Sequence, residues 1–402
     1  QPRDMMYLID DPSVDLKVSK QLFLSKYKRK QLRLKPLKKK KINIGYFSAD
    51  FRIHPVSILL ARILELHNRD EFIIYAYSFG PQKNDDMNLR IKKSVDHFKD
   101  VSLLNDNDLV EMVHGDKIDI AVDLMGYTGN ARPSLFSYRL APKQINYLGY
   151  SGTMGHESID YIIADEKLIP INDKKFYSEK VIYMKNTAIC CDDTLKLIRS
   201  RKKDNGLKRT LPDNAFIFAC FNNNFKISPD EFNIWMNLLK KNKNSYLWLK
   251  FSNDTSKFNL IKEADLRGVS SDKLIFAENV DFEEHIIRHS EADLFLDTFN
   301  YNAGSTAVIS LISGLPILTI YGNSYHSRMS SSLLLSLGLD ELVVFNKDEY
   351  QEKALYFSNH PKEIMQIKNK LNCLLENSDV FNSLSFVKEL EANFKSLVRK
   401  IY

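Results

Sequence analysis

The sequence has few cysteines, and their spacing argues against two kinds of covalent or metal-based stabilisation. The four cysteines form no C-x-x-C pair and have no histidine cluster nearby, so neither a structural metal site nor a disulfide framework is indicated. The simplest interpretation is a set of buried thiols in a reducing compartment, with reactivity of the adjacent pair as the less favoured alternative. The cysteines are Cys190, Cys191, Cys220 and Cys373.

Long apolar runs are also missing. No stretch of the 402 residues is apolar over the length needed to cross a bilayer, and we find no signal peptide. With 44% hydrophobic and 27% charged residues, the composition is typical of a globular protein. The length suffices for two domains that each bury a core of their own. We therefore predict a cytoplasmic protein without a membrane span.

Positive charge is only slightly in excess. The formal net charge is +6, and much of it comes from basic runs at 28–30, 38–41 and 199–203. No aromatic residues alternate with these runs, as they would in a groove that binds a nucleic-acid strand. We interpret the runs as solvated linkers or tails and predict no nucleic-acid partner.

Strand and helix patterns alternate along most of the chain and predict an α/β fold. Apolar strands expected at 42–47, 72–78, 119–124 and 144–148 end in Gly, Ser, Thr or Asp and are separated by helical patterns. This arrangement is typical of parallel sheets covered by helices on both faces, whose ligands bind at the carboxyl ends of the strands. The predicted order is a helical lead-in (1–41), a Rossmann-like domain (42–191), a polar linker (192–210), a second Rossmann-like domain (211–380) and a C-terminal helix (381–402), with a cleft between the domains.

Residues 292–320 read as strand, small-residue loop, helix and strand. The loop around Gly304, Ser305 and Thr306 would let a phosphate approach the backbone, and the free N–H groups of the following helix would attract an anion. Gly314 stands where the end of that helix is expected. An ordinary strand-helix-strand unit without a ligand explains this segment equally well.

Polar residues follow other strands of the predicted sheets. Asn223 and Lys226 come just after a strand, where an amide and an ammonium group suit a phosphate, or where a polar turn precedes a helix capped by Ser228. Asp50 and His54 follow the first strand and could orient a nucleophile, although a histidine before proline is more often a turn residue.

His285 and Arg288 lie three residues apart on a predicted helix and therefore share a face. A solvated surface pair is the ordinary interpretation of that spacing.

Seven longer motifs follow one another along the chain. They are SADFRIHPVS, DLMGYTGNAR, RLAPKQINYLGYSGTMGHESIDYIIAD, CFNNNFKISP, SYLWLKF, EEHIIRHSEADLFLDTF and GLPILTIYGNSYHSRMSSSLL. In this order, they resemble the family of O-linked N-acetylglucosamine transferases and SPINDLY-type enzymes, which are inverting glycosyltransferases, over nearly all of residues 42–390. The resemblance implies a GT-B fold with the donor on the second domain, the acceptor peptide in the cleft, and metal-independent transfer from a UDP-sugar without any cofactor.

The resemblance also implies roles for individual residues. Lys226 looks like the lysine that stabilises the leaving diphosphate, His54 like a histidine near the donor phosphate and sugar, and Asp50 like a carboxylate proposed to influence proton removal. The remaining matches concern donor binding. They are Asn223 at the diphosphate, His285 and Arg288 near the uracil, Gly304, Ser305 and Thr306 in the phosphate loop, and Leu148, Gly149 and Thr153 near the sugar.

Some positions depart from the family pattern. Gly304 replaces a histidine, and Ile309 stands where an aspartate would hold the ribose hydroxyls, which should weaken donor binding by about 1–3 kcal/mol. Val56 replaces a threonine and Ser151 a proline. The family histidine of the lead-in falls near Tyr27 and has no clear counterpart.

The organisation of the chain differs from that of the larger family members as well. The tetratricopeptide repeats that usually precede the catalytic part are not seen, so we expect a truncated or repeat-poor version. The long insert of the animal members is missing too, which favours a bacterial type.

Our leading hypothesis is a protein O-glycosyltransferase that transfers a sugar, with GlcNAc favoured, from a UDP-sugar to Ser or Thr. The group that removes the acceptor proton stays open among Asp50, His54, a donor phosphate oxygen and water. The alternatives are an N-glucosyltransferase acting on Asn and a catalytically silent binding subunit. The sugar, the acceptor protein and the oligomeric state are not indicated.

Overall fold

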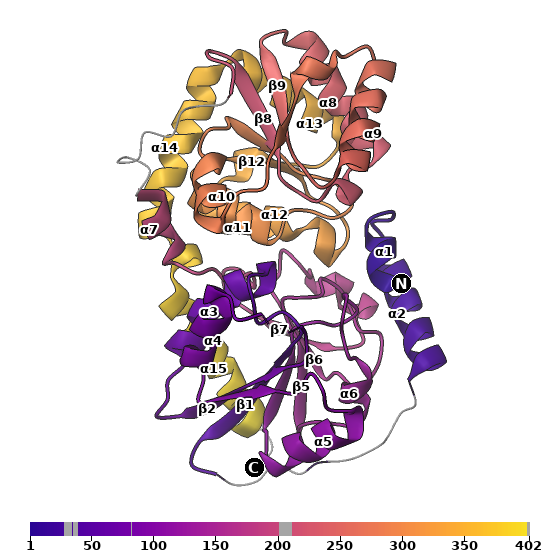
Figure 1. The fold of residues 1–402 in the computed structure, drawn as a ribbon, viewed down its shortest axis with the longest axis vertical. Helices are drawn as coiled ribbons and strands as arrows, with labels where there is room; N and C mark the ends of the chain where they lie inside the picture. Colours follow the sequence, from indigo (N-terminus) through magenta and orange to yellow (C-terminus); the bar gives the residue numbers. More distant parts are fainter. Residues whose placement is uncertain (28–33, 35–38, 82, 201–210, 400–402) are drawn as a thin grey trace. The chain divides into compact units, whose positions relative to one another are not determined.

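A computed structural model describes residues 1–27, 34, 39–81, 83–200 and 211–399 of the chain (Figure 1). The chain divides into two compact units. Unit 1 comprises Gln1–Asp193 and Asp379–Tyr402, and unit 2 comprises Thr194–Ser378. The lead-in and the C-terminal helix, which we expected as separate segments, thus both belong to unit 1. Within the predicted linker at 192–210, residues 201–210 lie outside the described residues.

Unit 1 is built on a seven-stranded parallel sheet in the order β3-β2-β1-β4-β5-β6-β7. The central strand β1 is apolar and buried along almost its whole length, as expected for a strand covered on both faces. The strand order reverses direction between β1 and β4, so the loops after these strands diverge at that point. The strands are β1 (Ile42–Ser48), β2 (Phe72–Ser78), β3 (His97–Asp100), β4 (Ile120–Asp123), β5 (Lys143–Asn146), β6 (Tyr161–Ala164) and β7 (Lys180–Tyr183).

Helices cover both faces of this sheet. In Figure 1, α3, α4 and α15 lie on one side and α5 and α6 on the other. Local sequence signals set their starts: Pro55 stands at the first position of α3, and the side chains of Asp85 and Asn105 cap α4 and α5. The helices are α1 (Pro2–Met6), α2 (Pro12–Lys26), α3 (Pro55–Leu66), α4 (Asp86–Ser94), α5 (Asp106–Gly115), α6 (Ser134–Ser137) and α15 (Ser383–Arg399).

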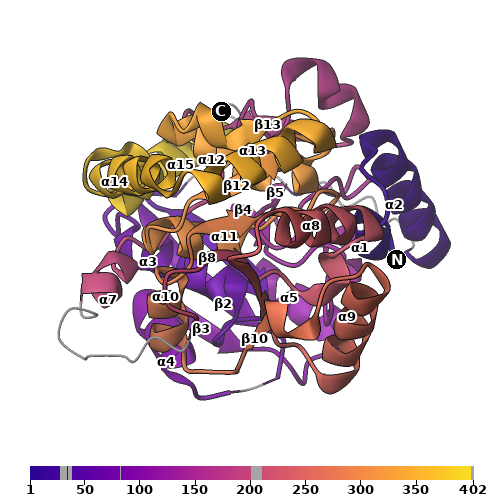
Figure 2. The same ribbon diagram turned by 90° about the horizontal axis from the view of Figure 1, so that it is seen from above.

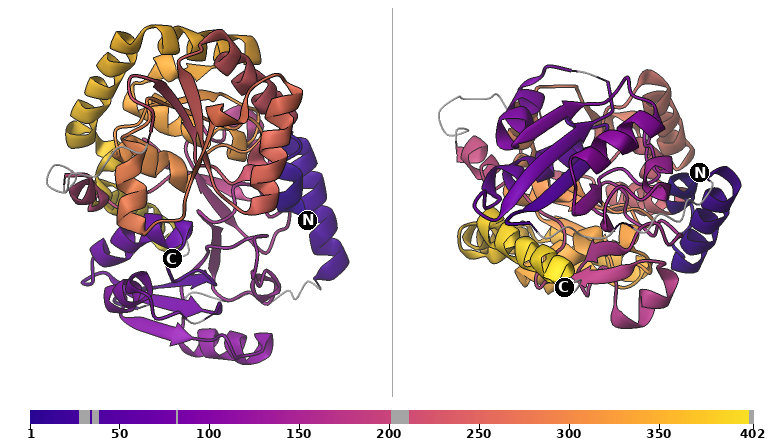
Figure 3. Two further views of the ribbon diagram at one scale, coloured as in Figure 1. Left: turned by 45° about the horizontal axis from the view of Figure 1, so that its top comes forward. Right: turned by 90° about the horizontal axis from the view of Figure 1, so that it is seen from below.

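The C-terminal helix α15 is held to unit 1 by a buried polar chain. Glu391 Oε1 accepts hydrogen bonds from His67 Nδ1 at 2.9 Å and from the backbone N–H of Asn68 at 2.7 Å. The other ring nitrogen of His67 contacts the hydroxyl of Tyr46 at 2.8 Å. Burial lowers the pKa of His67, so the ring is neutral and accepts from Tyr46. Figure 3 shows α15 in yellow beside the strands of unit 1.

Unit 2 contains a six-stranded parallel sheet in the order β10-β9-β8-β11-β12-β13. Its strand order reverses between β8 and β11. The carboxyl ends of these two strands are therefore the place where a ligand of a doubly wound sheet is expected. The strands are β8 (Phe216–Cys220), β9 (Ser245–Lys250), β10 (Leu274–Ala277), β11 (Leu294–Leu296), β12 (Ile317–Ile320) and β13 (Val343–Val344).

The helices of unit 2 pack in groups around this sheet. Figure 2 shows α10 beside α11 and α8 beside α13. The predicted cap of α8 is confirmed, because Ser228 and Glu231 form a capping box with Pro229 at the first position. The helices are α7 (Leu195–Ser200), α8 (Pro229–Lys241), α9 (Asp254–Leu266), α10 (Phe282–His289), α11 (Ser305–Ile312), α12 (Met329–Leu337), α13 (Lys347–Asn359) and α14 (Pro361–Asn377). No described helix has the length and apolarity needed to span a membrane.

Two expectations about surface and core residues were partly wrong. Cys373 is exposed, whereas the other cysteines are buried as predicted, and burial raises the pKa of Cys190 to about 12. Among the basic runs, Lys39 forms an ion pair with Asp119 at 2.7 Å and Arg199 donates to Asn372 Oδ1 at 2.5 Å, so these side chains are not solvated. The runs at 28–30 and 201–203 lie outside the described residues.

The Glu391 contacts predict a specific cost for loosening α15. Replacing Glu391 with Ala leaves His67 and the N–H of Asn68 without their buried acceptor, so the free energy of unfolding should fall by about 2–4 kcal/mol. Chemical denaturation measures this change. Lys388→Ala, on an exposed position of the same helix, is the matched control, and an equal effect in both variants would contradict the assignment.

Candidate functional site

A buried carboxylate, Asp297, organises the predicted phosphate loop of unit 2. Its Oδ1 accepts the backbone N–H groups of Thr298 and Ala303 at 2.9 and 2.8 Å and the amide of Asn222 at 3.1 Å. Its Oδ2 accepts from Thr319 Oγ1 at 3.0 Å. Burial raises the pKa of Asp297, and this rise is opposed by hydrogen bonds from Ser330, Ala303 and Thr319 and by the charge of Lys226. The carboxylate therefore ties together the loops after β8 and β11 and the strand β12.

Lys226 reaches the same loop from the other side of the strand-order reversal. Its ammonium group donates to the carbonyl of Asn302 at 2.8 Å and lies 4.1 Å from the ring centre of Tyr301. The Tyr301 ring is in turn stacked on His326, with ring centres 5.6 Å apart. A cation held against a carbonyl and an aromatic face is positioned within the loop that we predicted to bind diphosphate.

The helix α11 begins directly after this loop. Gly304 is its N-cap, and no side chain of the described residues caps the helix there. Ser305 and Thr306 are half-buried at its first positions. A side chain at Gly304 would first meet Met329 at 3.4 Å, so the missing histidine leaves room rather than a tight contact. The N–H groups at this end, with the helix dipole, suit an anion.

His285 and Arg288 lie half-buried on α10 and contact one another. Arg288 Nη2 lies 2.6 Å from His285 Nδ1, and Arg288 Nη1 donates to the carbonyl of Glu278 at 2.6 Å. Burial lowers the pKa of His285 to about 4, with smaller contributions from Arg288 and Lys250. The ring is therefore neutral and the pair is no solvated surface pair. Ile309 is buried in α11 and offers no hydrogen-bonding group.

Asp50 and His54 come together in unit 1 at the end of β1. Asp50 is buried, and its oxygens lie 2.9 Å from Arg52 Nη2 and 3.4 Å from His54 Nδ1. His54 caps α3, because its Nδ1 accepts the N–H of Val56 at 3.3 Å. Burial lowers the pKa of His54 and the Asp50 carboxylate opposes this. A neutral ring that accepts at Nδ1 carries its proton on Nε2, which makes Nε2 a donor.

The predicted sugar loop of unit 1 contains strained backbone. Leu148 has φ +70°, and the N–H of Gly149 donates to the carbonyl of Tyr147 at 2.9 Å, which closes a three-residue turn of the uncommon hand. Gly149 cannot carry a side chain, since a Cβ would lie 1.8 Å from the Leu124 carbonyl oxygen. This turn therefore requires the residues around it to hold it in place.

Thr153, which the resemblance places near the sugar, is a buried residue of this loop. The side chain is buried and donates to Glu179 Oε2 at 2.6 Å, while Glu179 Oε1 accepts the N–H of Met154 at 2.6 Å. Burial raises the pKa of Glu179, and these donors oppose the rise. Thr153 thus links this loop to Glu179. Sequence reasoning missed Glu179.

The lead-in helix α2 supports this loop from outside. His156 stacks on Phe23 of α2 with ring centres 3.7 Å apart, and the hydroxyls of Ser19 and Tyr150 lie 3.4 Å apart. Gly155 has φ +72° and lies so close to Ser19 that a Cβ would clash with it. The helical lead-in is thus an integral part of unit 1. Figure 3 shows its helices α1 and α2 in indigo.

The structure thus gathers the predicted residues into clusters within each unit. In unit 2, Asn223 precedes η3 (Asn224–Lys226), and Lys226, the last residue of η3, meets the loop before Ser305. Sequence reasoning missed Tyr301, Asp297 as an anchor, and Lys250. The available signal was a polar residue at the carboxyl end of an apolar strand, which Asp297 and Lys250 both satisfy.

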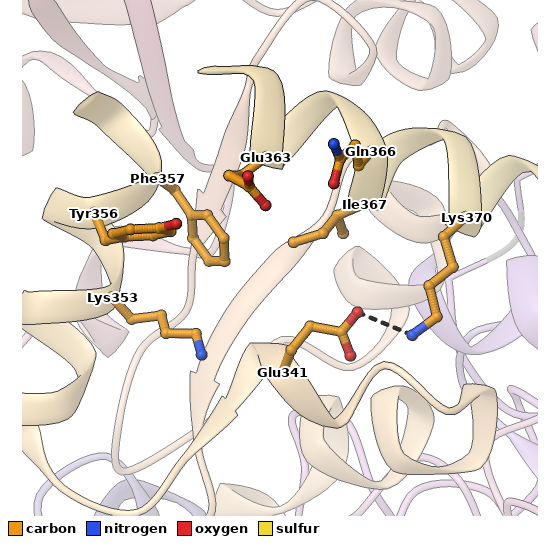
Figure 4. Close-up of a pocket in the computed structure, with 8 residues that line it drawn as sticks. All are labelled: Glu341, Lys353, Tyr356, Phe357, Glu363, Gln366, Ile367 and Lys370. Atoms are coloured by element: carbon orange, nitrogen blue, oxygen red, sulfur yellow. Dashed lines mark hydrogen bonds and ion pairs between the residues drawn. The ribbon is translucent and has the colours of Figure 1, made fainter. Parts of the chain in front are cut away.

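One further hollow, of about 730 Å³, lies between α13 and α14 (Figure 4). Tyr356, Phe357 and Ile367 line it together with side chains of both charges, among them Glu341 and Lys370, which form an ion pair at 2.9 Å. None of the predicted site residues lines this hollow.

The role of Asp297 can be tested by an isosteric change. Asp297→Asn replaces an acceptor by an amide, and one of the surrounding donors then meets an N–H group, so unfolding free energy should fall by about 1–3 kcal/mol. Thermal or chemical unfolding measures the loss, with Asp265→Asn on the exposed side of α9 as the control. Unchanged stability would show that the carboxylate does not anchor the loop.

The His156 stack predicts acid sensitivity. Burial lowers the pKa of His156 from 6.5 to about 3. A depressed folded-state pKa means that stability is present above 6.5 and is lost as the pH falls towards 3. His156→Phe keeps an aromatic ring that cannot be protonated. In wild type the free energy of unfolding should fall by about 1.4 kcal/mol per pH unit below 6.5, and the variant should lack this fall. Denaturation of both proteins across this range is the measurement, and parallel pH profiles would contradict the prediction.

Comparison with known proteins shows which family the chain belongs to. Residues 9–204 and 196–390 match the model of glycosyl transferase family 41. A probable UDP-N-acetylglucosamine--peptide N-acetylglucosaminyltransferase SEC of Arabidopsis thaliana is 32% identical over 359 residues, which are 88% of this chain and 37% of the relative. The corresponding SPINDLY protein of the same plant is 29% identical over 370 residues, 89% of this chain and 40% of the relative. The chain thus spans about two fifths of these relatives.

Solved structures agree. A lysine-to-methionine mutant of the Thermobaculum terrenum O-GlcNAc transferase superposes with a TM-score of 0.87 at 25% identity, over 98% of this chain and 75% of that one. Anabaena HepE, solved with UDP and glucose, has a TM-score of 0.54 at 12% identity over 87% of this chain and 99% of that one, a likeness of fold alone. The predicted α/β fold of the GT-B type is confirmed, and the chain belongs to glycosyl transferase family 41.

Proposed function

We propose that the chain is an inverting protein O-glycosyltransferase that transfers a sugar, with GlcNAc favoured, from a UDP-sugar to Ser or Thr of a protein. The observation that carries the proposal is the position of Lys226 in the loop before the open N-terminus of α11. Relatives named as UDP-N-acetylglucosamine--peptide N-acetylglucosaminyltransferases supply the donor and the peptide acceptor of the proposal. We further propose that the protein acts in the cytoplasm.

The chemistry follows from the charge that develops on the leaving group. The acceptor oxygen forms a bond to the anomeric carbon while the bond from that carbon to the β-phosphate oxygen breaks, and attack from the opposite face inverts the configuration. The leaving diphosphate gains negative charge as the bond breaks. The ammonium group of Lys226 and the N–H groups at Ser305 and Thr306 are positioned to stabilise that charge, so we propose that no metal ion or cofactor is needed.

The hydrogen bonds of His54 reduce the number of groups that could accept the proton of the acceptor hydroxyl. Because its Nδ1 accepts from Val56, the neutral ring offers an N–H at Nε2, which suits donation to a phosphate or sugar oxygen. The candidates that accept a proton without a change of tautomer are then Asp50, a donor phosphate oxygen and water. Asp50 is itself engaged by Arg52. We therefore assign His54 to donor binding rather than to the general base.

The decisive variant is Lys226→Met. Transfer should fall by at least about a hundredfold, because a charge that stabilises the leaving group is lost. Incubation with a panel of UDP- and other nucleotide sugars plus protein acceptors, followed by mass spectrometry of the products, measures turnover and maps the modified residue. Lys240→Met, at an exposed position of α8, is the control.

Near-normal transfer by Lys226→Met would sink the assignment of this lysine. Sugar found on Asn rather than on Ser or Thr would replace the O-glycosyltransferase by an N-glucosyltransferase. Wild-type protein that neither hydrolyses any nucleotide sugar nor binds UDP in calorimetry would favour the silent binding subunit.

A further inference from the structure

We propose that Lys250 is a second cation for the donor diphosphate, which it holds together with the amide of Asn223 from the β9 side of the site. The inference rests on the proposed function, since it names a further group that binds the same donor. Lys250 is the last residue of β9, the strand next to β8. It therefore stands at the carboxyl edge of the sheet, beside the point where the strand order reverses.

Direct contacts join Lys250 to the loop that carries Lys226. Its ammonium group donates to Asn223 Oδ1 at 2.6 Å, and its backbone carbonyl accepts from Asn224 Nδ2 at 3.1 Å. Asn223 and Asn224 are the residues that lead from β8 to Lys226 through η3. The ammonium groups of Lys226 and Lys250 thus flank one short loop, one on the β11 side and the other on the β9 side.

Lys250 lacks a counterion within the part of the chain that the structure describes. Two other half-buried lysines each have one: Lys99 pairs with Asp116 at 2.6 Å and Lys368 lies 3.3 Å from Asp293. Lys250 instead is close enough to Arg288 for repulsion, and burial together with Arg288 lowers its pKa. Cations this close together cost stability. Glu284 near Arg288 offsets part of that cost, and an anionic ligand would remove more of it.

The hydrogen-bonding groups that Lys250, Asn223 and His285 offer to a ligand are donors. Asn223 Oδ1 is taken by Lys250, so its free amide nitrogen is a donor. His285 is neutral and lies with Nδ1 2.6 Å from Arg288 Nη2, so its proton is on Nε2. The ammonium of Lys250 is a donor as well. A cluster that offers donors fits a group made only of acceptors, and a phosphate is such a group.

Lys250 would also compensate for a donor contact that is lost at Ile309. Ile309 is buried and cannot accept from the ribose, so the nucleotide needs another anchor in this chain. A charge on the diphosphate at Lys250 would supply it.

The test compares Lys250→Met, Lys250→Arg and the control Lys262→Met, an exposed position of α9, in calorimetry with UDP, pyrophosphate and uridine. Lys250→Met should weaken UDP and pyrophosphate by about tenfold or more, because a charge-assisted hydrogen bond is lost, and leave uridine unchanged. Lys250→Arg should retain most of the affinity. Wild-type binding of UDP at alkaline pH should take up protons, seen as a dependence on buffer ionisation enthalpy, and Lys250→Met should lose that uptake.

The outcomes separate this inference from the proposed function. The inference is overturned if wild type and Lys250→Met bind UDP with equal affinity and thermal unfolding curves show that both are folded. The proposed donor site is then left intact. A loss confined to uridine overturns the phosphate assignment. Wild-type protein that binds neither UDP nor pyrophosphate overturns both. Weakened pyrophosphate and UDP binding in Lys250→Met, restored by Lys250→Arg, supports it.

Discussion

The buried Asp297 carboxylate is the constraint on which the site of unit 2 depends. A charge without water must be surrounded by donors, and those donors come from the loops after β8 and β11 and from β12. Satisfying the carboxylate therefore fixes the path of residues 298–304, and this path presents the Asn302 carbonyl and the Tyr301 ring to Lys226. The arrangement of Lys226, Asn302 and Tyr301 at this edge is thus a consequence of how the buried Asp297 is surrounded by donors.

In unit 1, a strained backbone turn likewise depends on the residues that surround it. The strained turn at Leu148 persists because its surroundings determine it: Gly149 packs against the Leu124 carbonyl, and Glu179 holds Thr153 and the Met154 N–H. The helix α2 adds the His156 stack on the outside. Conformational strain at a loop of this kind requires a rigid support, and the lead-in helix provides part of it.

Much of the fold could be predicted because apolar strands and capped helices are local signals. The strands β1, β2, β8 and β11 and the helix start at Ser305 follow from hydrophobic runs, small-residue turns and a proline or cap. Short strands such as β3, β6 and β7 were missed, since four residues carry little pattern, and those of β3 and β7 are partly exposed. The family resemblance identified the site residues as a set but not their contacts.

The sequence by itself determined the α/β class, the polar residues at strand ends and the family. These depend on short-range patterns and on the order of motifs, both of which are readable along one chain. The tertiary structure alone decided that Thr153 donates to Glu179, that His54 Nδ1 accepts from Val56, and that Lys250 donates to Asn223 and forms no ion pair with a carboxylate among the described residues. These facts depend on contacts between residues far apart in the chain and on burial, which sets pKa values and hydrogen-bond roles.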